Sequence, residues 1–304
     1  MGGAQKRTIK NILQLSSEFL AEQGVESPRL DAEVLLADLL NTERIKLYVN
    51  FDYPLNQQEL DAYRQRIRER ARGKPVSYLT GRREFMSLEL IVEEGVLIPR
   101  PETEELVEVV LDFCRSQNWE QPKIVDVGTG SGAILVSLLH YLPEARGVGI
   151  DISTLALEVA RKNLERFELK NRAGLLEGDL LKPLLPEKEG QLDLIISNPP
   201  YIPESEISRL PRNVRQEPRE ALAAGADGLK IYRRLIPQAC RLLRQGGMLA
   251  LEIGHDQSQR VKEILNQTDG SDSSDCWQDI KLRRDGGGRE RIILALKGSE
   301  DDGD

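Results

Sequence analysis

Hydrophobic positions in the first 75 residues recur every three or four residues, the spacing of one helix face. The pattern predicts helices through Ile9 to Leu20, through Leu30 to Leu39, from a cap at Thr42 to Val49, and through Leu60 to Ile67. Gly24 is placed to end the first of them. This stretch lacks the residue types that usually perform catalysis. We therefore predict a small all-helical N-terminal domain over residues 1–75 that serves recognition or docking.

The fourth predicted helix runs into a cluster of basic residues, namely Arg64, Arg66, Arg68, Arg70, Arg72 and Lys74. Such a cluster could meet an acidic partner or RNA. A solvated helix face explains it as well, because Glu69 lies among the basic residues, and we favour that interpretation.

The periodicity changes after residue 75. Gly81 and Gly95 bracket roughly alternating apolar positions from Phe85 to Val92, which predicts a β-hairpin linker over 76–98. Strand and helix patterns then alternate over 99–298. The predicted strands are 123–127, 146–150, 173–177, 192–197, 248–253, 277–282 and 291–296, and the helices between them are 133–141, 153–169, 229–244 and 257–266.

Alternation of this kind is typical of an α/β fold with a doubly wound parallel sheet, here of about seven strands with an antiparallel closing pair. Gly246 and Gly247 are expected to stop the helix before the fifth strand. Residues 268–275, rich in Ser, Asp and Gly, are predicted to form a loop.

Composition narrows the class of protein. The chain has 304 residues, 39% of them hydrophobic and 30% charged, as in a water-soluble globular protein. No apolar run approaches the ~18–20 residues of a membrane span, and residues 1–7 do not begin a signal peptide, so we expect a cytoplasmic protein without a membrane partner. A net charge of −8 argues against a stable nucleic-acid partner. The acidic stretch 299–304 is predicted to be a disordered tail.

Cysteines and histidines are few. Cys114, Cys240 and Cys276 lie far apart without paired spacing, and the only histidines are His140 and His255. We therefore expect neither a disulfide nor a metal site.

The stretch Asn198-Pro199-Pro200-Tyr201 follows the apolar strand 192–196. Neither proline can donate to a sheet ladder, so the chain leaves the sheet at Asn198. The carboxyl ends of parallel strands are where such sheets bind ligands. Carbonyl oxygens of Asn198 and Pro199 could accept both hydrogens of one planar –NH2 group, while Tyr201 packs on it. Because an amide nitrogen is a weak nucleophile, this corner suits transfer of a group to nitrogen by positioning. A simple Pro-Pro turn, with Asn198 as a cap, is the alternative.

A glycine-rich loop follows the first strand of the sheet: Gly128, Thr129, Gly130, Ser131 and Gly132, after Asp126. It matches neither the dinucleotide fingerprint nor the P-loop. It instead suits a nucleoside with a cationic amino-acid arm, which Asp126 could face.

Two further acids follow neighbouring strands. Asp151, after the second strand, could take two ribose hydroxyls, and Asp179, after the third, an adenine amino group. Each acid alone could be a solvated loop residue. Together with the glycine loop and the Asn198 corner, they predict S-adenosylmethionine as the cofactor and an amine acceptor. Arg100, between Pro99 and Pro101, is a rigidly presented cation that could line the site.

Several segments resemble the release factor glutamine methyltransferases of the PrmC/HemK type over nearly the whole chain. They are 75–81, 96–105, 126–133, 197–202, 217–222 and 251–255. The resemblance implies a class I methyltransferase (Rossmann-like) domain over 99–298. It also implies methyl transfer from S-adenosylmethionine to the N5 nitrogen of the Gly-Gly-Gln glutamine in class I peptide chain release factors, with S-adenosylhomocysteine as the product.

The resemblance also implies roles for particular residues. Cofactor contacts carry over to Gly128–Gly132, Asp151, Asp179, Leu180 and Asn198, and substrate contacts to Asn198, Pro199, Pro200, Tyr201 and Arg100. Asn198, Pro199 and Tyr201 are the implied catalytic residues, and the helical domain would bind the release factor. Leu180 stands where the family commonly has an aromatic residue, so a backbone contact is expected there.

Two other functions use the same features. A DNA adenine-N6 methyltransferase would hold a flipped base in the same corner but needs a basic surface, which this chain offers only around Arg64 to Lys74. The second alternative is an interaction module that binds the cofactor but lacks activity. The intact Asn198 corner and the intact glycine loop argue against it.

Overall fold

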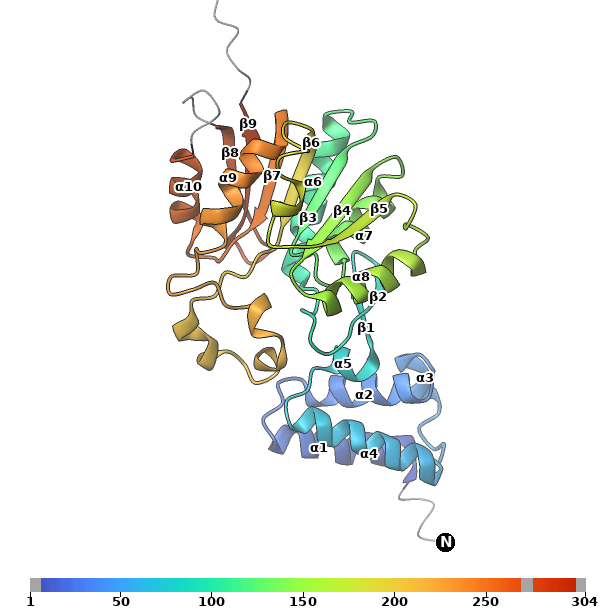
Figure 1. Cartoon of the computed structure of the whole chain (residues 1–304). Helices are drawn as coiled ribbons and strands as arrows, with labels where there is room; N and C mark the ends of the chain where they lie inside the picture. The colour runs from blue at the N-terminus through green and yellow to red at the C-terminus, as the bar shows by residue number, and fades with distance from the viewer. Residues whose placement is uncertain (1–6, 269–275, 299–304) are drawn as a thin grey trace, which may run out of the picture. The chain divides into compact units, whose positions relative to one another are not determined.

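A computed structural model describes residues 7–268 and 276–298. The chain divides into two compact units, shown in Figure 1. The first comprises Met1–Arg82 with Pro211–Gln216, and the second Arg83–Leu210 with Glu217–Asp304. The acidic tail and most of the predicted loop 268–275 lie outside the described residues. None of the helices in the described part combines the length and the apolar composition that a membrane span requires.

The first unit is helical, as predicted. Its helices are α1 (Ile9–Glu22), α2 (Pro28–Leu39), α3 (Arg44–Val49), α4 (Gln57–Ala71) and α5 (Val76–Thr80). Leu13, Leu35 and Leu36 are fully buried in its core, and the Tyr63 hydroxyl donates to the Ala32 carbonyl oxygen at 2.9 Å. Asn56 and Glu59 form a capping box at the start of α4. Thr42 does not cap α3, because that helix begins one residue later, after Glu43.

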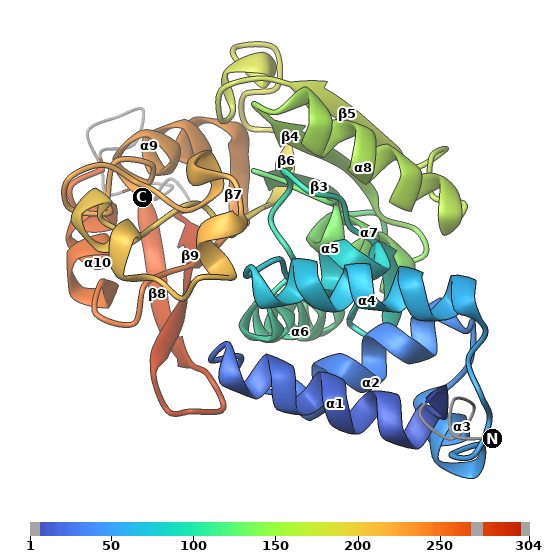
Figure 2. The ribbon, with the colours of Figure 1, turned by 90° about the horizontal axis from the view of Figure 1, so that it is seen from below.

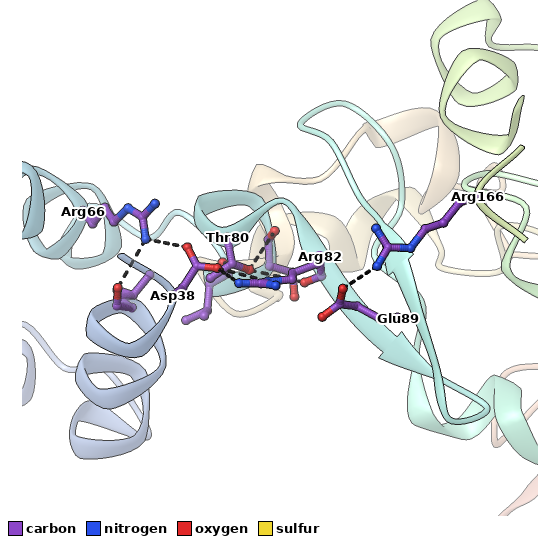
Figure 3. Close-up of polar contacts among 9 residues, drawn as sticks. Asp38, Arg66, Thr80, Arg82, Glu89 and Arg166 are labelled. Atoms are coloured by element: carbon purple, nitrogen blue, oxygen red, sulfur yellow. Dashed lines mark hydrogen bonds and ion pairs between the residues drawn. The ribbon is translucent and has the colours of Figure 1, made fainter. Parts of the chain in front are cut away.

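The basic cluster of α4 is only partly a solvated face. Arg66 donates to Asp38 at 2.6 Å and Arg70 to Asp31 at 2.6 Å, and both acids belong to α2. Arg82 pairs with the other oxygen of Asp38, as Figure 3 shows. The side chains of Arg66 and Arg70 are 26% and 12% exposed, so their ion pairs are better shielded from water than surface pairs. The cluster therefore helps to hold α4 against α2.

The predicted hairpin is shorter than expected. It consists of β1 (Arg82–Phe85) and β2 (Leu88–Ile91), whereas residues 76–80 form the short helix α5, which ends at Gly81 with φ of 72°. Met86 and Ser87 at the turn both have positive φ, as two-residue hairpin turns require. Glu89 of β2 pairs with Arg166 at 2.6 Å (Figure 3).

The second unit contains the seven-stranded sheet that the alternation predicts. Its strands are β3 (Lys123–Val127), β4 (Arg146–Asp151), β5 (Ala173–Glu177), β6 (Leu192–Ser197), β7 (Leu243–Glu252), β8 (Trp277–Arg284) and β9 (Glu290–Lys297). They lie in the order β5-β4-β3-β6-β7-β9-β8. The first five strands are parallel, and β9 is antiparallel to both β7 and β8. The class I methyltransferase fold is thereby confirmed.

Two layers of helices cover the sheet. One face packs α6 (Pro101–Ser116), α7 (Ala133–Tyr141) and α8 (Thr154–Arg166), together with the hairpin, against alternate residues such as Ile124, Leu194 and Met248. The opposite face packs α9 (Tyr232–Leu242) and α10 (Ser258–Asn266) against Val125, Ile195 and Leu249. Figure 2 shows the sheet between these layers. The described residues also include 3₁₀ helices at Lys182–Leu184, Glu204–Arg209, Val214–Gln216 and Arg219–Ala221.

Gly246 and Gly247 do not stop a helix. Helix α9 ends at Leu242, because Leu243 already pairs with Leu192 in the sheet. A Cβ on Gly247 would lie 3.0 Å from the Leu192 carbonyl oxygen, so the glycine allows two strands to approach closely.

The expectation that no disulfide forms is wrong. Cys240 of α9 and Cys276, directly before β8, are disulfide-bonded, with their Cα atoms 6.2 Å apart. The pair is 36 residues apart in sequence, and only the packing of α9 beside the closing strands brings the thiols together. Cys114 is a free, buried cysteine.

Candidate active site

The predicted site residues follow the carboxyl ends of neighbouring parallel strands. Strand order reverses between β3 and β6, since β4 and β5 extend the sheet on one side of β3 and β6 and β7 on the other. Such a reversal leaves a crevice at the strand ends where ligands bind. The glycine loop follows β3 and the Asn198 corner follows β6. The Ser197 hydroxyl donates to the Val127 carbonyl oxygen at 2.6 Å, so the two segments leave the sheet side by side.

The glycine loop exposes its backbone. Gly128, Gly130 and Gly132 have φ of 71°, 57° and 79°, which side-chain-bearing residues rarely adopt. A Cβ on Gly128 would meet nothing within 4 Å, and one on Gly130 would meet only the Gly128 carbonyl oxygen at 4.0 Å. There is thus open space for a ligand beside these two residues. Gly132 has a different role, because its Cβ would lie 3.2 Å from Ala160 of α8.

Thr129 and Ser131 turn away from that space. Thr129 is 5% exposed and donates its hydroxyl to Asp126 at 2.6 Å. Ser131 is 2% exposed, and its carbonyl oxygen accepts from the Asn163 side chain at 2.8 Å. Any contact that these two residues make with a cofactor would therefore come from the backbone.

Asp151 ends β4 with both carboxylate oxygens engaged by the backbone. One accepts from Gly130 N and the other from Ser153 N, each at 2.9 Å. Burial raises the pKa of this carboxyl group above its ordinary value, and these bonds oppose the rise. Each oxygen keeps a further lone pair, so the carboxylate could accept two hydroxyl groups while tied to the loop.

Asp126 is fully buried beneath the loop. Burial raises the pKa of its carboxyl group to about 7, and the Thr129 hydroxyl opposes the rise. Its Oδ1 atom has no hydrogen-bond partner among the described residues. A buried acid with one unused oxygen suits a site that receives a cation.

Asp179 follows β5 and is already paired. Its carboxylate accepts from Arg234 of α9 and, at 2.8 Å, from Lys182. The Lys182 hydrogen bond is the main cause of the lowered pKa of Asp179. Leu180 has φ of 56° and packs against the core beside α9, so its side chain is half-buried.

The corner after β6 is built around the Asn198 amide. Asn198 Nδ2 donates to the Thr103 hydroxyl at 2.8 Å, and this hydroxyl donates to Glu252 Oε2 at 2.6 Å. The Asn198 Oδ1 and Pro199 carbonyl oxygens accept no hydrogen bond from the described residues. Two adjacent acceptors are thereby left for a planar –NH2 group.

Tyr201 is held by the same cluster. Its hydroxyl lies 3.4 Å from Glu252 Oε1, and its carbonyl oxygen accepts from Gln257 Nε2 at 2.9 Å. Burial raises the pKa of Tyr201 to about 12, with help from the Glu252 charge, so the phenol stays neutral. Pro199 is buried and Pro200 half-buried beside it.

Glu252 is a site residue that sequence reasoning missed. It ends β7, is 1% exposed, and has a pKa raised by burial to about 7. Its position near the carboxyl end of a predicted strand is the sequence feature that could have identified it as a candidate. Thr103 was missed as well, because nothing in the pattern around it distinguishes the third residue of α6 from an ordinary helix start.

Arg100 does not stand free. Its guanidinium group pairs at 2.6 Å with Glu217, whose side chain is 1% exposed. The other Glu217 oxygen accepts from Ile98 N at 3.1 Å. Two segments singled out by their sequence, 96–105 and 217–222, are therefore joined by a partly buried ion pair, and Glu217 positions Arg100.

Asn163 of α8 is another fully buried residue that the sequence pattern did not indicate. Its amide binds the backbone of β2, at Ile91 N and Ile91 O, with distances of 2.7 and 2.9 Å. It also donates to Ser131 O, so one side chain ties the hairpin to the glycine loop. Among the described residues no group of three or more histidines, cysteines or acids is arranged to hold a metal ion.

Known families match this chain in two stretches. The PrmC N-terminal domain matches residues 11–81, and a methyltransferase domain matches residues 120–292.

Similar proteins span the chain almost completely. The release factor glutamine methyltransferase of Moorella thermoacetica is 45% identical over 96% of this chain and 100% of its own length. The protein of the same name from Rhodopirellula baltica is 40% identical over 95% of this chain and 96% of its own. Among solved structures, the hMettl16 catalytic domain bound to an RNA hairpin aligns with a TM-score of 0.53 at 17% identity. The alignment covers 70% of this chain and 76% of that one, and the likeness concerns the fold alone.

Proposed function

Because this chain belongs to the release factor glutamine methyltransferase family, we propose that it methylates a glutamine side chain of class I peptide chain release factors. The acceptor atom is N5 of the glutamine in the Gly-Gly-Gln sequence, and the methyl donor is S-adenosylmethionine. The observation that carries the proposal is the pair of unused acceptors, Asn198 Oδ1 and Pro199 O, beside the glycine loop.

The residues at the strand ends fit the cofactor. The open backbone of Gly128 to Gly132 would hold its amino-acid arm above the buried Asp126, and Asp151 would accept the ribose hydroxyls. Asp179 and the Leu180 backbone would border the adenine, and Asn198 would close the site from β6. When bound, the cofactor supplies a methyl group on a positively charged sulfur, which is a strong electrophile.

The glutamine amide needs orientation more than activation. Asn198 Oδ1 and Pro199 O accept its two N–H hydrogens, which aims the nitrogen lone pair and draws electron density toward it. Tyr201 packs against the amide, and Pro200 stiffens the corner. Arg100, steadied by Glu217, contacts the substrate chain. The amide proton leaves to water after transfer, so we assign no general base.

We assign recognition of the release factor body to the helical domain 1–75, followed by the linker 76–98 and the methyltransferase domain 99–298. We also place this activity in the cytoplasm, since that is where release factors meet the ribosome.

Mass spectrometry of a co-expressed release factor tests the proposal. One added methyl group is expected on the glutamine of the Gly-Gly-Gln peptide, and none when the Gly-Gly-Gln glutamine of the release factor is replaced. If the protein bound the cofactor but left the peptide unmodified, an interaction module without activity would be favoured. If labelled methyl groups were transferred to duplex DNA and not to the release factor, an adenine-N6 methyltransferase would be favoured.

A further inference from the structure

The amide of Asn198 can serve its role in only one of two orientations. With Oδ1 toward the substrate, the amide accepts a hydrogen bond from the glutamine –NH2. If the amide were rotated by 180°, its own –NH2 would face the glutamine –NH2, and two donors cannot bond to each other. An asparagine amide is nearly symmetrical in shape, so packing alone does not select between the two. The selection must come from a hydrogen-bond partner on the far side of the amide.

That partner is the Thr103 hydroxyl, and its direction is set by Glu252. A carboxylate only accepts hydrogen bonds, so at 2.6 Å from Glu252 Oε2 the hydroxyl must donate to it. The hydroxyl then has only lone pairs to offer Asn198, 2.8 Å away. It must therefore meet the –NH2 end of the amide, which leaves Oδ1 facing the other way.

We infer that Thr103 and Glu252 are positioning residues that fix the Asn198 amide with its oxygen toward the methyl acceptor. The inference rests on the proposed function, because it concerns how the amide-binding side chain is presented. Thr103 comes from the start of α6, Glu252 from the end of β7, and Asn198 directly follows β6. Three elements thus meet at one short relay of hydrogen bonds.

The relay works while Glu252 is ionised. A protonated Glu252 could donate to the Thr103 hydroxyl, which would free that hydroxyl to donate to Asn198 and reverse the amide. The groups that face Glu252 are Thr103 and Glu102 of α6, Arg291 of β9, Tyr201 and Tyr232. Arg291 favours the ionised form and Glu102 opposes it, while burial has the largest effect on the pKa.

The test compares variants of the full chain in methyl transfer to a release factor with saturating cofactor. Thr103→Val keeps the shape and removes the hydroxyl, and kcat should fall by about tenfold or more, the effect of about one hydrogen bond. The dissociation constant of S-adenosylhomocysteine should stay within about twofold, since the relay does not touch the glycine loop. Thr103→Ser should recover most of the rate. Ser137→Ala, which deletes a buried hydroxyl that donates to Ala133 O within α7, is the matched control and should leave kcat unchanged.

The pH profile separates positioning from mere stability. In the native chain kcat should decline as the pH drops below about 7 and Glu252 takes up a proton. Glu252→Gln should remove that decline and lower kcat at pH 8, and this variant carries the test if Thr103→Val does not fold. Full activity of Thr103→Val, or an unchanged acid limb in Glu252→Gln, would overturn the inference.

A measurement without substrate distinguishes this inference from the proposed function. In the NMR spectrum of the native chain, one Asn198 Nδ2 proton should be protected from solvent exchange, and Thr103→Val should abolish the protection. If the native chain showed this protection but methylated no release factor, the proposed function would fail while the orientation of the amide held. If the native chain methylated a release factor while its Asn198 protons exchanged freely, the proposed function would stand and the relay would not.

Discussion

Individual side chains of the site combine buried acids with neutral hydrogen-bonding groups. Asp126 and Glu252 are fully buried, and burial is the main reason why the pKa of each is raised. In the proposed mechanism, the Asn198 amide is held by Thr103 on one side and accepts a hydrogen bond from the substrate through Oδ1 on the other. Its replacement should therefore reduce methyl transfer far more than cofactor binding, since the glycine loop and Asp151 supply most of the cofactor contacts.

Asn198→Ala is expected to lower kcat by about 100-fold or more, the usual loss when one preorganised polar contact to the reacting group is removed. The dissociation constant of the cofactor should change by less than about threefold, because the glycine loop and Asp151 remain. Radiolabel transfer measures the first quantity and calorimetry the second. Asn171→Ala, at an exposed position, is the control. Normal turnover by Asn198→Ala would remove Asn198 from the mechanism.

The two buried acids also predict how stability depends on pH. Asp126 and Glu252 titrate at about 7 in the folded chain, against 3.8 and 4.5 without burial. Between these values the folded state holds protons that the unfolded state has released, so their contribution to the free energy of unfolding falls as pH rises. This contribution to the free energy of unfolding is fully present below about pH 4 and fully lost above about pH 7. It amounts to on the order of 3–4 kcal/mol for each group.

Urea unfolding of Asp126→Asn at pH 5 and pH 8 checks this dependence. The variant should lose less stability between the two values than the native chain does. Glu144→Gln, which removes an exposed carboxylate, should behave like the native chain. An identical slope for Asp126→Asn would show that Asp126 titrates normally.

Among the helices and strands, the support of the glycine loop comes from elements far from it in sequence. Asn163 joins helix α8 to strand β2 and to Ser131, and the hairpin therefore supports the glycine loop where we propose that the cofactor binds. Gly132 adds to this support, since its missing side chain lets α8 pack 3.2 Å from where a Cβ would stand. The glycines of the loop thus serve both ligand approach and helix packing.

Asn163→Ala should lower the free energy of unfolding by about 3 kcal/mol, because it leaves one buried and two partly buried backbone groups without partners. It should also weaken cofactor binding by about tenfold, since Ser131 loses its anchor. Thermal melts with and without S-adenosylhomocysteine measure both effects. Asn171→Ala again provides the comparison. Unchanged cofactor affinity in a destabilised Asn163→Ala would confine the role of Asn163 to folding.

The whole chain consists of two compact units. The first matches the PrmC N-terminal domain, and ion pairs join its helices α2 and α4. The candidate site residues all belong to the second unit. The net charge of −8 makes a protein partner easier to accommodate than a nucleic acid. Recognition by one unit and chemistry by the other is the arrangement that we propose.

A fragment comprising residues 83–304 should still bind cofactor and methylate a short Gly-Gly-Gln peptide. Its kcat/KM for an intact release factor should fall by about tenfold or more, since each lost 1.4 kcal/mol of substrate binding is a factor of about ten. A thermal shift with S-adenosylhomocysteine verifies that the fragment folds. Equal efficiency on the intact release factor would mean that the helical domain does not contribute to recognition.

Features that depend on neighbouring residues could be predicted from the amino-acid sequence. Hydrophobic periodicity located the seven strands, the first four helices of the first unit and a hairpin, but it missed the short helix α5 and made the hairpin too long. The glycine loop and the Asn198 corner were visible because each is built from residues adjacent in the chain. Some errors arose where a second local interpretation existed, as at Gly247, which spaces two strands instead of ending a helix.

The distant side chains that complete the site became visible only in the folded chain. Thr103 lies 95 positions from Asn198 and 149 from Glu252, and no spacing rule joins residues that far apart. The same holds for Arg100 with Glu217 and for Cys240 with Cys276. Hydrophobic periodicity indicates which face of a helix or strand is buried. It does not indicate which partner a buried polar side chain contacts, because that depends on how the elements pack.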